Sequence, residues 1–522
     1  MGIWNFLKSR PQPPEEAYAP PQTDSAADRK MDRMHLQRLI DIRALCGGTG
    51  DLIVHELEVS GVSCAVVLCE GMVDTNTFSK MFALPLTSLS LSDASPQAVL
   101  TWVRKHALLA PDQKEIYTYT ELFRFIMSGF VVLLIDGVEP GIVFGIQGYT
   151  GRSVSEPSGE TNERGSREGF IEKLRPNISM VRRRFKSPDL MFEMITFGER
   201  SRTDAALVYL RGTVAPELLR KVKERLSKVR MDVVLESGYI QPFLDAKPLS
   251  LFSGVGYTER PDTLCAKVAE GRIGLIVDGT PYALIVPYLF NEHFQSLDDY
   301  AHRPYYATFI RWLKYAAFFF SILLPGFYVA VGSFHPELLP ATLLNSLLVS
   351  EETTPFPLML EALVIFFIYE IMREAGLRMP QSVGHAVSIV GALVIGDAAV
   401  SAGIIGTPMV IVVAVTAISS FVVPTLYEPI TILRFAFMLI GGMFGIFGVA
   451  AAFFAVAANL CAVNPLGVPA TTPATPFSLY SMRDVLFRWG WKTLAQEDLR
   501  VQGLTGSDIS TQGGKNNADK AT

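Results

Sequence analysis

Six ionisable side chains interrupt the apolar C-terminal half of this 522-residue sequence. Glu428 and Arg434 lie near a loop, and we assign them a structural role; the other four are Glu361, Glu370, His385 and Asp397. Ionisable groups are costly in hydrocarbon, so those found in membrane segments usually line a water-filled cavity or have a partner. Carboxylates on such a path favour cations. We therefore interpret these four residues as candidate pore or polar membrane residues.

Two of the four also have a specific structural interpretation. Glu370 precedes Arg373 by three residues, which is the spacing of an ion pair on one helix face. His385 lies near the basic end of its segment and fits a satisfied polar contact. Glu361 and Asp397 lie deeper in their apolar segments, so these two are the stronger candidates for a water-filled path.

Enzyme motifs are missing from the sequence: it has no P-loop, dinucleotide-binding glycine pattern, HExxH or GxSxG. Its 7 histidines are dispersed, and its 5 cysteines lack the spacing of a zinc site or a disulfide framework. We expect no enzyme activity, no cofactor and no catalytic or metal site.

Composition divides the chain near residue 309, after which long uncharged stretches dominate to about residue 463. The sequence is 49% hydrophobic and 19% charged, and its net charge of −5 argues against a general nucleic-acid binder. We expect an α/β soluble N-terminal half with two related subdomains, followed by an all-α polytopic membrane domain. The predicted boundaries are a disordered leader at 1–33, α/β subdomain 1 at 34–150, a basic amphipathic helical joint at 151–189, α/β subdomain 2 at 190–300, the membrane domain at 301–465 and a C-terminal tail at 466–522.

A weak internal repeat supports the two related subdomains. The stretches "GFVVLLIDGVEPGIVFGI" and "GRIGLIVDGTPYALIVPY" share a glycine, an apolar run and an Asp-Gly pair at the same spacing. Each predicts a β-hairpin, and upstream matches predict a strand and then a helix before it. We assign Asp136 and Asp278 to turns, because Asp-Gly favours the positive φ of a tight hairpin.

A basic run lies between the two copies. Its candidate assembly or joint residues are Arg167, Arg175, Arg182, Arg183 and Arg184. Apolar residues recur around them at intervals of three and four, which predicts one or two amphipathic helices broken near Pro176. A joint between subdomains explains this pattern, a membrane-surface or subunit contact is the second interpretation, and nucleic acid is disfavoured.

The apolar half predicts several membrane crossings. A first segment opens with Arg311 and Lys314 and runs almost uncharged to residue 334, long enough to span a bilayer. These flanking cations place the soluble half in the cytoplasm by the positive-inside rule. The last run, 430–463, is long, and Gly441-Gly442 is a candidate kink. Four crossings plus a kinked or re-entrant element and five full crossings both fit, so the side of the tail stays open.

Six ordered segments span both halves: "GSREGFIEKLRPNISMVRRR", "FGERSRTDAALVYLRG", "YTERPD", "HPELLP", "EIMREAGLRMPQSVGHAVSIVGALVIGDAAVSAGI" and "PMVIVVAVTAISSF". Together they resemble the A subunits of GerA-type spore germinant receptors, from about residue 35 to 490. His385 and Asp397 depart from that resemblance, since uncharged amides are expected there, and "PATPF" is looser than the usual proline motif.

The resemblance implies a multi-pass protein of the spore inner membrane with a cytoplasmic N-terminal domain. Its implied partners are a B-type polytopic subunit, a C-type lipoprotein subunit and membrane lipid. It also implies a homo-oligomer, with a pentamer as one form, that acts as a nutrient-gated channel releasing monovalent cations at the start of germination. The alternatives are a secondary transporter, since midplane charges and broken helices are transporter features, and an accessory sporulation membrane protein related to the A subunits.

Overall fold

The computed structural model describes residues 29–91, 94–106, 113–148, 156–157, 159–245, 250–378, 396–478, 481–494 and 500–509. Among these, residues 29–148 and Ile178–Phe192 form one compact unit. Residues 156–177 and the chain from Glu193 onward form the second unit. The division falls within helix α7 (Leu174–Arg184), and each unit is considered by itself.

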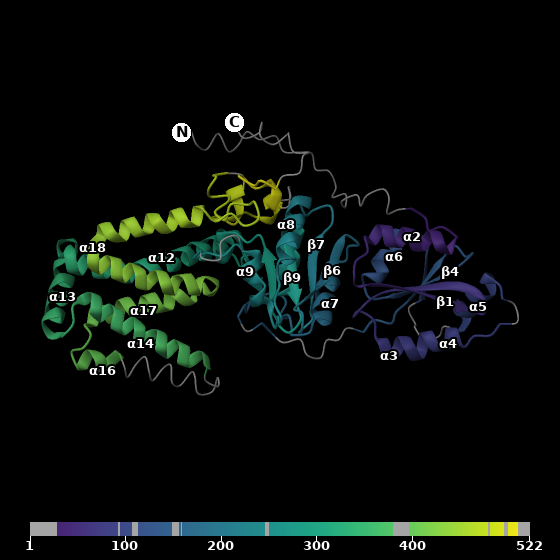
Figure 1. The fold of residues 1–522 in the computed structure, drawn as a ribbon, viewed down its shortest axis with the longest axis horizontal. Helices are drawn as coiled ribbons and strands as arrows, with labels where there is room; N and C mark the ends of the chain where they lie inside the picture. Colours follow the sequence, from purple (N-terminus) through teal and green to yellow (C-terminus); the bar gives the residue numbers. More distant parts are fainter. Residues whose placement is uncertain are drawn as a thin grey trace. The chain divides into compact units, whose positions relative to one another are not determined.

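The first unit contains a five-stranded antiparallel sheet in the order β1-β2-β4-β5-β3 (Figure 1). Its strands are β1 (Leu52–Val59), β2 (Val62–Cys69), β3 (Gln113–Ile116), β4 (Val131–Ile135) and β5 (Gly141–Phe144). Helices α2 (His35–Cys46) and α6 (Tyr119–Ile126) pack on one face. The other face is covered by α5 (Pro96–His106) and by the segment α3 (Thr75–Thr77), η1 (Phe78–Ala83) and α4 (Leu84–Thr87). Because both faces are covered, the central strand β4 is buried along its whole length.

The second sheet also has five strands, in the order β6-β7-β9-β10-β8. Its strands are β6 (Leu190–Phe197), β7 (Thr203–Leu210), β8 (Gly256–Thr258), β9 (Ile273–Val277) and β10 (Ala283–Val286). Helices α8 (Pro216–Leu226) and α9 (Gln241–Leu244) share its main hydrophobic core, and α10 (Pro261–Ala269) packs against β7 and β9. The two sheets therefore have the same strand order, which confirms the predicted pair of related α/β subdomains.

Equivalent glycines repeat the same backbone conformation in the two sheets. The pairs with positive φ are Gly71 (74°) and Gly212 (78°), Gly129 (86°) and Gly271 (88°), and Gly137 (76°) and Gly279 (93°). L-residues rarely adopt this region, so the repeated glycines of the sequence have a direct conformational reason.

The Asp-Gly turns also hold the start of a helix in each copy. Asp136 Oδ1 accepts the backbone N–H of His35 at 2.9 Å, at the start of α2. Asp278 Oδ1 accepts the backbone N–H of Leu174 at 2.9 Å, at the start of α7. Each carboxylate therefore satisfies a free N–H group at a helix N-terminus, a role that turn chemistry alone did not predict.

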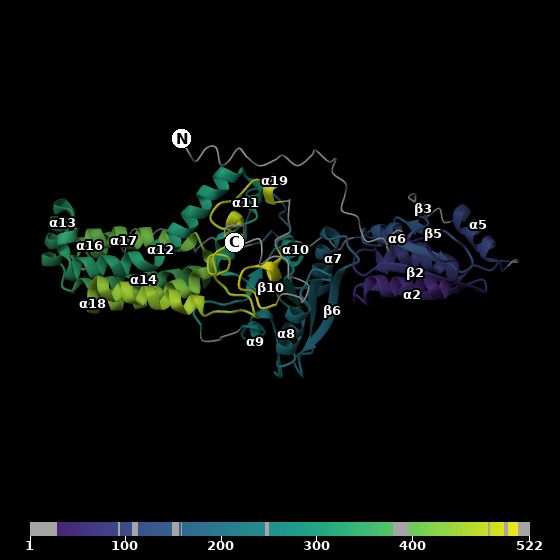
Figure 2. The same cartoon turned by 90° about the horizontal axis from the view of Figure 1, so that it is seen from above.

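The C-terminal half is helical, and its longest helices lie side by side in both views (Figure 1, Figure 2). Its helices are α12 (Pro304–Phe334), α13 (Ala341–Thr353), α14 (Leu358–Arg378), α16 (Gly396–Ser401), α17 (Thr407–Phe421) and α18 (Tyr427–Cys461). By length and composition, α12 and the segment Pro424–Cys461 could each cross a membrane. The α/β and helical halves together confirm the predicted fold class.

Helix α18 is interrupted at Gly445, which adopts φ 63° and ψ −156°. The chain doubles back there: a Cβ built on Gly448 would lie 3.0 Å from Ile440 Cγ2, whereas eight residues of straight helix span about 12 Å. The break in α18 therefore lies at Gly445 and not at the predicted kink, Gly441-Gly442. A Cβ on Gly441 would lie 2.4 Å from the backbone oxygen of Gly326, so this glycine serves close packing against α12 instead.

The C-terminal tail returns to the second α/β subdomain. Leu466, Val468, Val501 and Ile509 belong to the same buried core as strands β7 and β9. Backbone hydrogen bonds at 2.9 Å join Phe290 N–H to the oxygen of Ala470, and Val501 N–H to the oxygen of Glu270. The tail, with η7 (Ser481–Asp484), α19 (Trp491–Leu494) and η8 (Val501–Gly503), is therefore part of this subdomain.

Candidate functional site

Glu361 lies in the first turn of α14 and is 2% exposed. Its Oε1 accepts the backbone N–H of Gly406 at 2.7 Å. Gly406 is the residue immediately before α17, so the carboxylate lies at the positive end of that helix. Within one chain, Glu361 therefore has a buried partner that stabilises its negative charge.

Asp397 and His385 differ from Glu361 in setting. Asp397 lies in the first turn of α16 with its side chain exposed, and it is available to a group outside this chain. His385 lies outside the described residues.

Glu370 is the centre of an ionic cluster that joins α14 to α18. Its two carboxylate oxygens bind Arg434 Nη1 at 3.2 Å and Arg373 Nε at 3.1 Å. The hydroxyl of Tyr427 donates to Glu370 Oε2 at 2.7 Å. Arg434 is fully buried and also donates to the backbone oxygen of Ser321 on α12 at 3.1 Å, so the cluster connects three helices.

The pairing of Glu370 with Arg373 follows from their spacing, but the role of Arg434 does not. We missed Arg434 because we treated it as a residue near a loop. The available signal was an arginine inside an apolar segment, which requires a counter-charge wherever it is buried.

Arg182 of the basic run forms a buried ion pair within the first unit. Its guanidinium binds Asp51 through Nε to Oδ2 at 2.6 Å and Nη2 to Oδ1 at 2.9 Å, with side chains 1% and 3% exposed. It also donates to the backbone oxygens of Ser187 and Leu190 at 2.8 Å. Arg182 thus stabilises the interior of the first unit.

The remaining arginines of the run are more accessible. Arg167 is exposed and lies 3.7 Å from Glu156 Oε1, and Arg175 is exposed. Arg183 and Arg184 are partly buried, and Arg184 Nη1 donates to the backbone oxygen of Met180 at 3.2 Å.

The run contains one helix rather than two. Pro176 lies in the first turn of α7, where its missing N–H is not needed, and no helix precedes it between residues 159 and 173. The predicted break at Pro176 is therefore a helix start.

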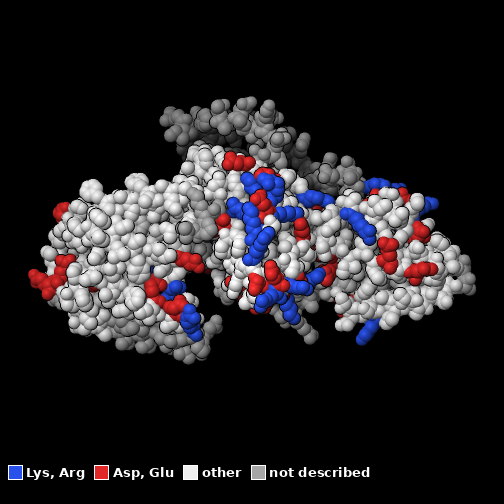
Figure 3. All heavy atoms as spheres, in the orientation of Figure 1, with Lys and Arg blue, Asp and Glu red and all other residues white. Residues whose placement is uncertain are grey.

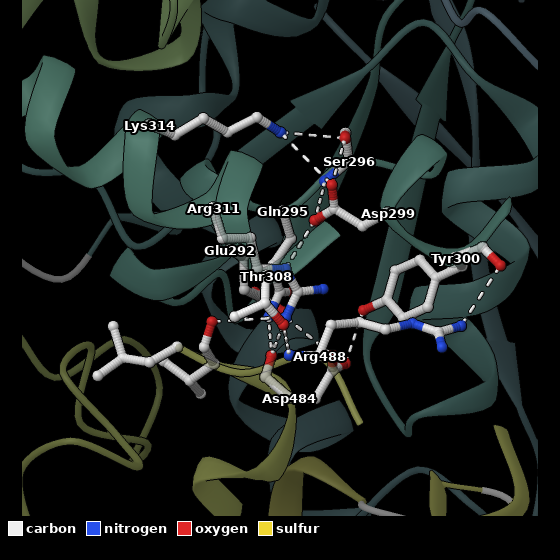
Figure 4. A network of polar contacts seen from close by, with 12 residues as sticks. Glu292, Gln295, Ser296, Asp299, Tyr300, Thr308, Arg311, Lys314, Asp484 and Arg488 are labelled. Carbon is white, nitrogen blue, oxygen red and sulfur yellow. Dashed lines mark hydrogen bonds and ion pairs between the residues drawn. The ribbon is translucent and has the colours of Figure 1, made fainter. Parts of the chain in front are cut away.

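A second polar cluster lies where α12, the second α/β subdomain and the tail meet (Figure 4). Arg311 is fully buried, and it binds Asp299 Oδ2 through Nε at 2.7 Å and Asp484 Oδ1 through Nη1 at 2.9 Å. The hydroxyl of Tyr300 donates to Asp484 Oδ2 at 2.7 Å. Burial and the Asp484 carboxylate hold the pKa of Tyr300 well above its usual value, so the phenol stays a donor.

The positive-inside argument treated Arg311 as a free flanking cation, but the structure gives it two carboxylate partners. Neither partner could be assigned from the sequence, because Asp484 lies in the tail, 173 residues away. The cluster fixes the start of α12 to both the subdomain and the tail.

A third cluster surrounds Glu292 in the same region. Its Oε1 binds Lys267 Nζ at 2.5 Å and Arg272 Nη2 at 2.6 Å. Burial raises the pKa of Glu292, but Arg272 and Lys267 outweigh it and lower the pKa below its usual value. Glu292 is therefore ionised and electrically matched at neutral pH.

A cavity of about 830 Å³ lies beside these clusters and is here called the junction cavity. Its lining includes Glu160, Lys267, Glu292, His293, Lys314 and Trp491. These residues come from the joint, α10, η3 (Phe290–Phe294), α12 and α19. Among the described residues, no group of His, Cys, Asp and Glu has the arrangement of a metal site. The region therefore combines the buried ion pairs of Arg311 and Glu292 with the adjacent junction cavity.

Comparison with known proteins places this chain in a family. A model of the "Bacillus/Clostridium GerA spore germination protein" matches residues 41–498. Spore germination protein KA of Bacillus subtilis (strain 168) is 39% identical over 472 residues, which cover 90% of this chain and 86% of that protein. The uncharacterised membrane protein YfkQ of the same organism is 35% identical over 476 residues, which cover 90% and 91% of the two chains.

One solved structure is also similar: the N-terminal domain of the A subunit of the Bacillus megaterium spore germinant receptor GerK3. It is 25% identical with a TM-score of 0.39, and the match covers 50% of this chain and 98% of that domain.

The chain belongs to the GerA family of spore germination proteins. The family expected from the six segments is thereby confirmed.

Proposed function

We propose that this chain is the A-type membrane subunit of a nutrient-responsive spore germination receptor and that it forms a channel for monovalent cations. In this proposal it lies in the spore inner membrane with its N-terminal domain in the cytoplasm. It assembles with copies of itself, with a pentamer as one form, and with a B-type polytopic subunit and a C-type lipoprotein subunit.

The observation that carries the proposal is the surface of the helical half. Large apolar side chains stand out from several of its helices, among them Phe367 (62% exposed), Ile418 (68%), Phe447 (82%) and Phe454 (71%). On the face drawn in Figure 3, charged side chains on this half gather at its two ends and leave the middle almost uncharged. Lipid or neighbouring subunits must cover such a surface, because water would solvate it poorly.

The polar groups in the interior of the bundle support a role in conduction. The Glu370 cluster and the Glu361 contact are directed inward between helices, as ionisable groups at membrane depth are expected to be. Glu361 and Asp397 remain our candidates for residues beside the cation path. Asp397 is the first to test, because its exposed side chain is free to face a neighbouring copy.

The experiment is nutrient-triggered potassium release from spores that lack their own receptors and carry this chain with its B-type and C-type partners. Asp397→Ala and Glu361→Ala are compared with wild type at equal membrane levels. Altered release rate or ion preference in either variant supports a channel beside these acids. Unchanged release in both removes them from the path.

An accessory role related to the A subunits is the second candidate, since the chain is also 35% identical to YfkQ, an uncharacterised membrane protein. Normal assembly of this chain with its partners, but no release with any nutrient mixture, would favour it.

A further inference from the structure

A separate cavity of about 580 Å³ lies at the start of α12 and is here called the arginine cavity. Its lining contains no acid and three arginines: Arg164, Arg303 and Arg488. None of the three forms an ion pair with a carboxylate in the part of the chain that the structure describes. Arg164 and Arg303 are exposed, whereas Arg488 is only 3% exposed. The cavity is therefore positively charged.

Arg488 is a buried cation whose charge the described residues do not neutralise. Its Nη1 donates to the backbone oxygen of Trp489 at 3.0 Å and its Nη2 to that of Tyr300 at 3.4 Å (Figure 4), and its Nε has no hydrogen-bond partner among the described residues. The guanidinium lies 5.1 Å from the ring centroid of Trp491 and 5.6 Å from that of Tyr300. Such cation–π contacts offset only part of the cost of burying a charge. An anion in the cavity would supply the missing counter-charge.

The acids of the neighbourhood do not serve this purpose. The two aspartates bound to Arg311 carry two negative charges, which Arg311 and Lys314 together balance. Asp298 accepts the backbone N–H groups of residues 163 and 164, and the side chain of Glu163 is 79% exposed, so water screens its charge. Neither Asp298 nor Glu163 lines the arginine cavity, so the three arginines are in excess there.

An exposed apolar stripe leads from the cavity along α12. Its side chains recur at intervals of three and four, which places them on one helix face: Tyr305, Phe309, Trp312, Ala316 and Phe320. Helix rise gives the stripe a length of about 22 Å, compared with about 15 Å for the hydrocarbon of one bilayer leaflet. The stripe is therefore long enough to accompany acyl chains, and Tyr305, which also lines the cavity, joins it to the arginines.

The tail adds exposed aromatic side chains at the start of α12: Phe487, Trp489 and Trp491. The indole N–H of Trp312 donates to the backbone oxygen of Leu486 at 3.0 Å, and its ring meets that of Phe487 edge-on at a centroid distance of 5.3 Å. Tryptophan and tyrosine are enriched where hydrocarbon meets lipid headgroups. The combined surface has the composition of a membrane interface.

We infer that the arginine cavity binds the headgroup of an anionic phospholipid, such as phosphatidylglycerol, with its acyl chains along the apolar stripe of α12. The lipid phosphate supplies the counter-charge that Arg488 lacks, and the exposed Arg164 and Arg303 add to the attraction. A soluble phosphate would use the arginines but not the stripe. The inference rests on the membrane location proposed above and is independent of cation conduction.

The position of the cavity gives such binding a consequence. Its lining comes from the joint, the end of the second α/β subdomain, α12 and the tail, so one headgroup would contact all of them. A bound lipid would therefore stabilise the attachment of the tail to the start of α12.

The test uses the purified full chain in phosphatidylcholine nanodiscs, to which phosphatidylglycerol with brominated acyl chains is added in increasing mole fraction. Bromine quenches tryptophan fluorescence at short range, and three of the 5 tryptophans of the chain belong to this surface: Trp312, Trp489 and Trp491. Brominated phosphatidylcholine measures non-selective contact. We expect half-maximal quenching at a mole fraction at least about 10-fold lower for phosphatidylglycerol than for phosphatidylcholine.

Two variants test the arginines. Arg303→Gln and Arg488→Gln should each reduce the preference for phosphatidylglycerol by about 5-fold, as expected for one cation near an anionic lipid. Because Arg303 is exposed, its variant tests the inference even if loss of the buried Arg488 disturbs folding. Arg230→Gln is the matched control, since Arg230 is also exposed but lies outside the cavity, and it should keep the wild-type preference.

Equal quenching by the two lipids in wild type would overturn the inference. A preference that survives both arginine variants, or an equal loss in Arg230→Gln, would do the same. Displacement of the lipid by inorganic phosphate or a nucleotide at constant ionic strength would assign the cavity to a soluble phosphate instead. A chain that does not enter nanodiscs would contradict the proposed membrane location as well, whereas normal lipid preference without cation release would count only against the channel.

Discussion

Protonation of His293 should loosen the contact between the second α/β subdomain and the helical bundle. His293 lies in η3, and its Nδ1 is 3.0 Å from the hydroxyl of Thr425, in the loop between α17 and α18. Its ring meets that of Tyr288 edge-on at a centroid distance of 4.9 Å. Burial lowers its pKa from 6.5 to about 4, although the nearby Glu292 carboxylate acts in the opposite direction.

The sign and size of the effect follow from this difference. The unfolded or locally opened state binds a proton below pH 6.5, whereas the folded state resists protonation down to about pH 4. Stability from neutral His293 is therefore complete above pH 6.5 and is lost as the pH falls towards 4. The total is about 3 kcal/mol, of which about 2 kcal/mol is lost at pH 5, equal to about a 30-fold change in an opening equilibrium.

Hydrogen exchange of the full chain in nanodiscs at pH 7 and pH 5, corrected for intrinsic rates, measures this change. Peptides covering Phe290–Phe294 and the loop at 422–426 should lose about 30-fold protection at pH 5 in wild type. His293→Asn, which keeps a polar group near Thr425, should show little pH dependence. His55→Asn is the control, because His55 is exposed on β1. Equal loss of protection in His293→Asn and wild type would refute the reasoning.

Two further predictions concern buried contacts. Asp51→Asn should destabilise the first unit by about 3–5 kcal/mol, because Arg182 would be left buried and unpaired. Hydrogen exchange in β1 and β2 measures this loss of stability. Asp232→Asn is the control, because Asp232 forms an exposed ion pair whose loss should cost under about 1 kcal/mol. Gly326→Val should prevent the close approach of α12 and α18, since even a Cβ there would lie 2.6 Å from the backbone oxygen of Phe437. Reduced membrane levels of the folded chain are expected, and wild-type levels would contradict the importance of this contact.

The sequence was sufficient for the repeated architecture, because its signals were local. A glycine, an apolar strand and an Asp-Gly turn recur at fixed spacing, and each element has a backbone requirement that few other residues meet. The first and third strands of each sheet carry no such signal. Strand β1 alternates charged and apolar residues, and neither it nor its counterpart β6 ends in a turn dipeptide shared by the two copies. The place of β1 in the sheet is therefore seen only in the structure, where it pairs with β2.

The ion pairs could not be predicted for a different reason. Arg182 with Asp51 and Arg311 with Asp484 join residues separated by 131 and 173 positions, and no periodicity connects them. Glu370 with Arg373 was predictable because both lie on one helix at a separation of three. Sequence patterns therefore identified which charges needed partners more readily than they identified the partners.

The position of the tail bears on our proposal for the membrane topology, for which the sequence left two forms open. Its apolar residues complete the core of the second α/β subdomain, and Asp484 binds Arg311 at the start of α12. With the helical half in a membrane, as we propose, the chain must enter and leave on the same side, which requires an even number of crossings. Five full crossings would place Leu466 and Val468 across the bilayer from the core that they fill. The reversal at Gly445 makes an even number possible, because α18 leaves the subdomain before this residue and returns to it afterwards. Near the end of α18, the hydroxyl of Ser250 in the subdomain donates to Asn459 Oδ1 at 3.3 Å. The positive φ of Gly445 thus helps to bring the tail back to the side of Arg311, where Asp484 binds its guanidinium.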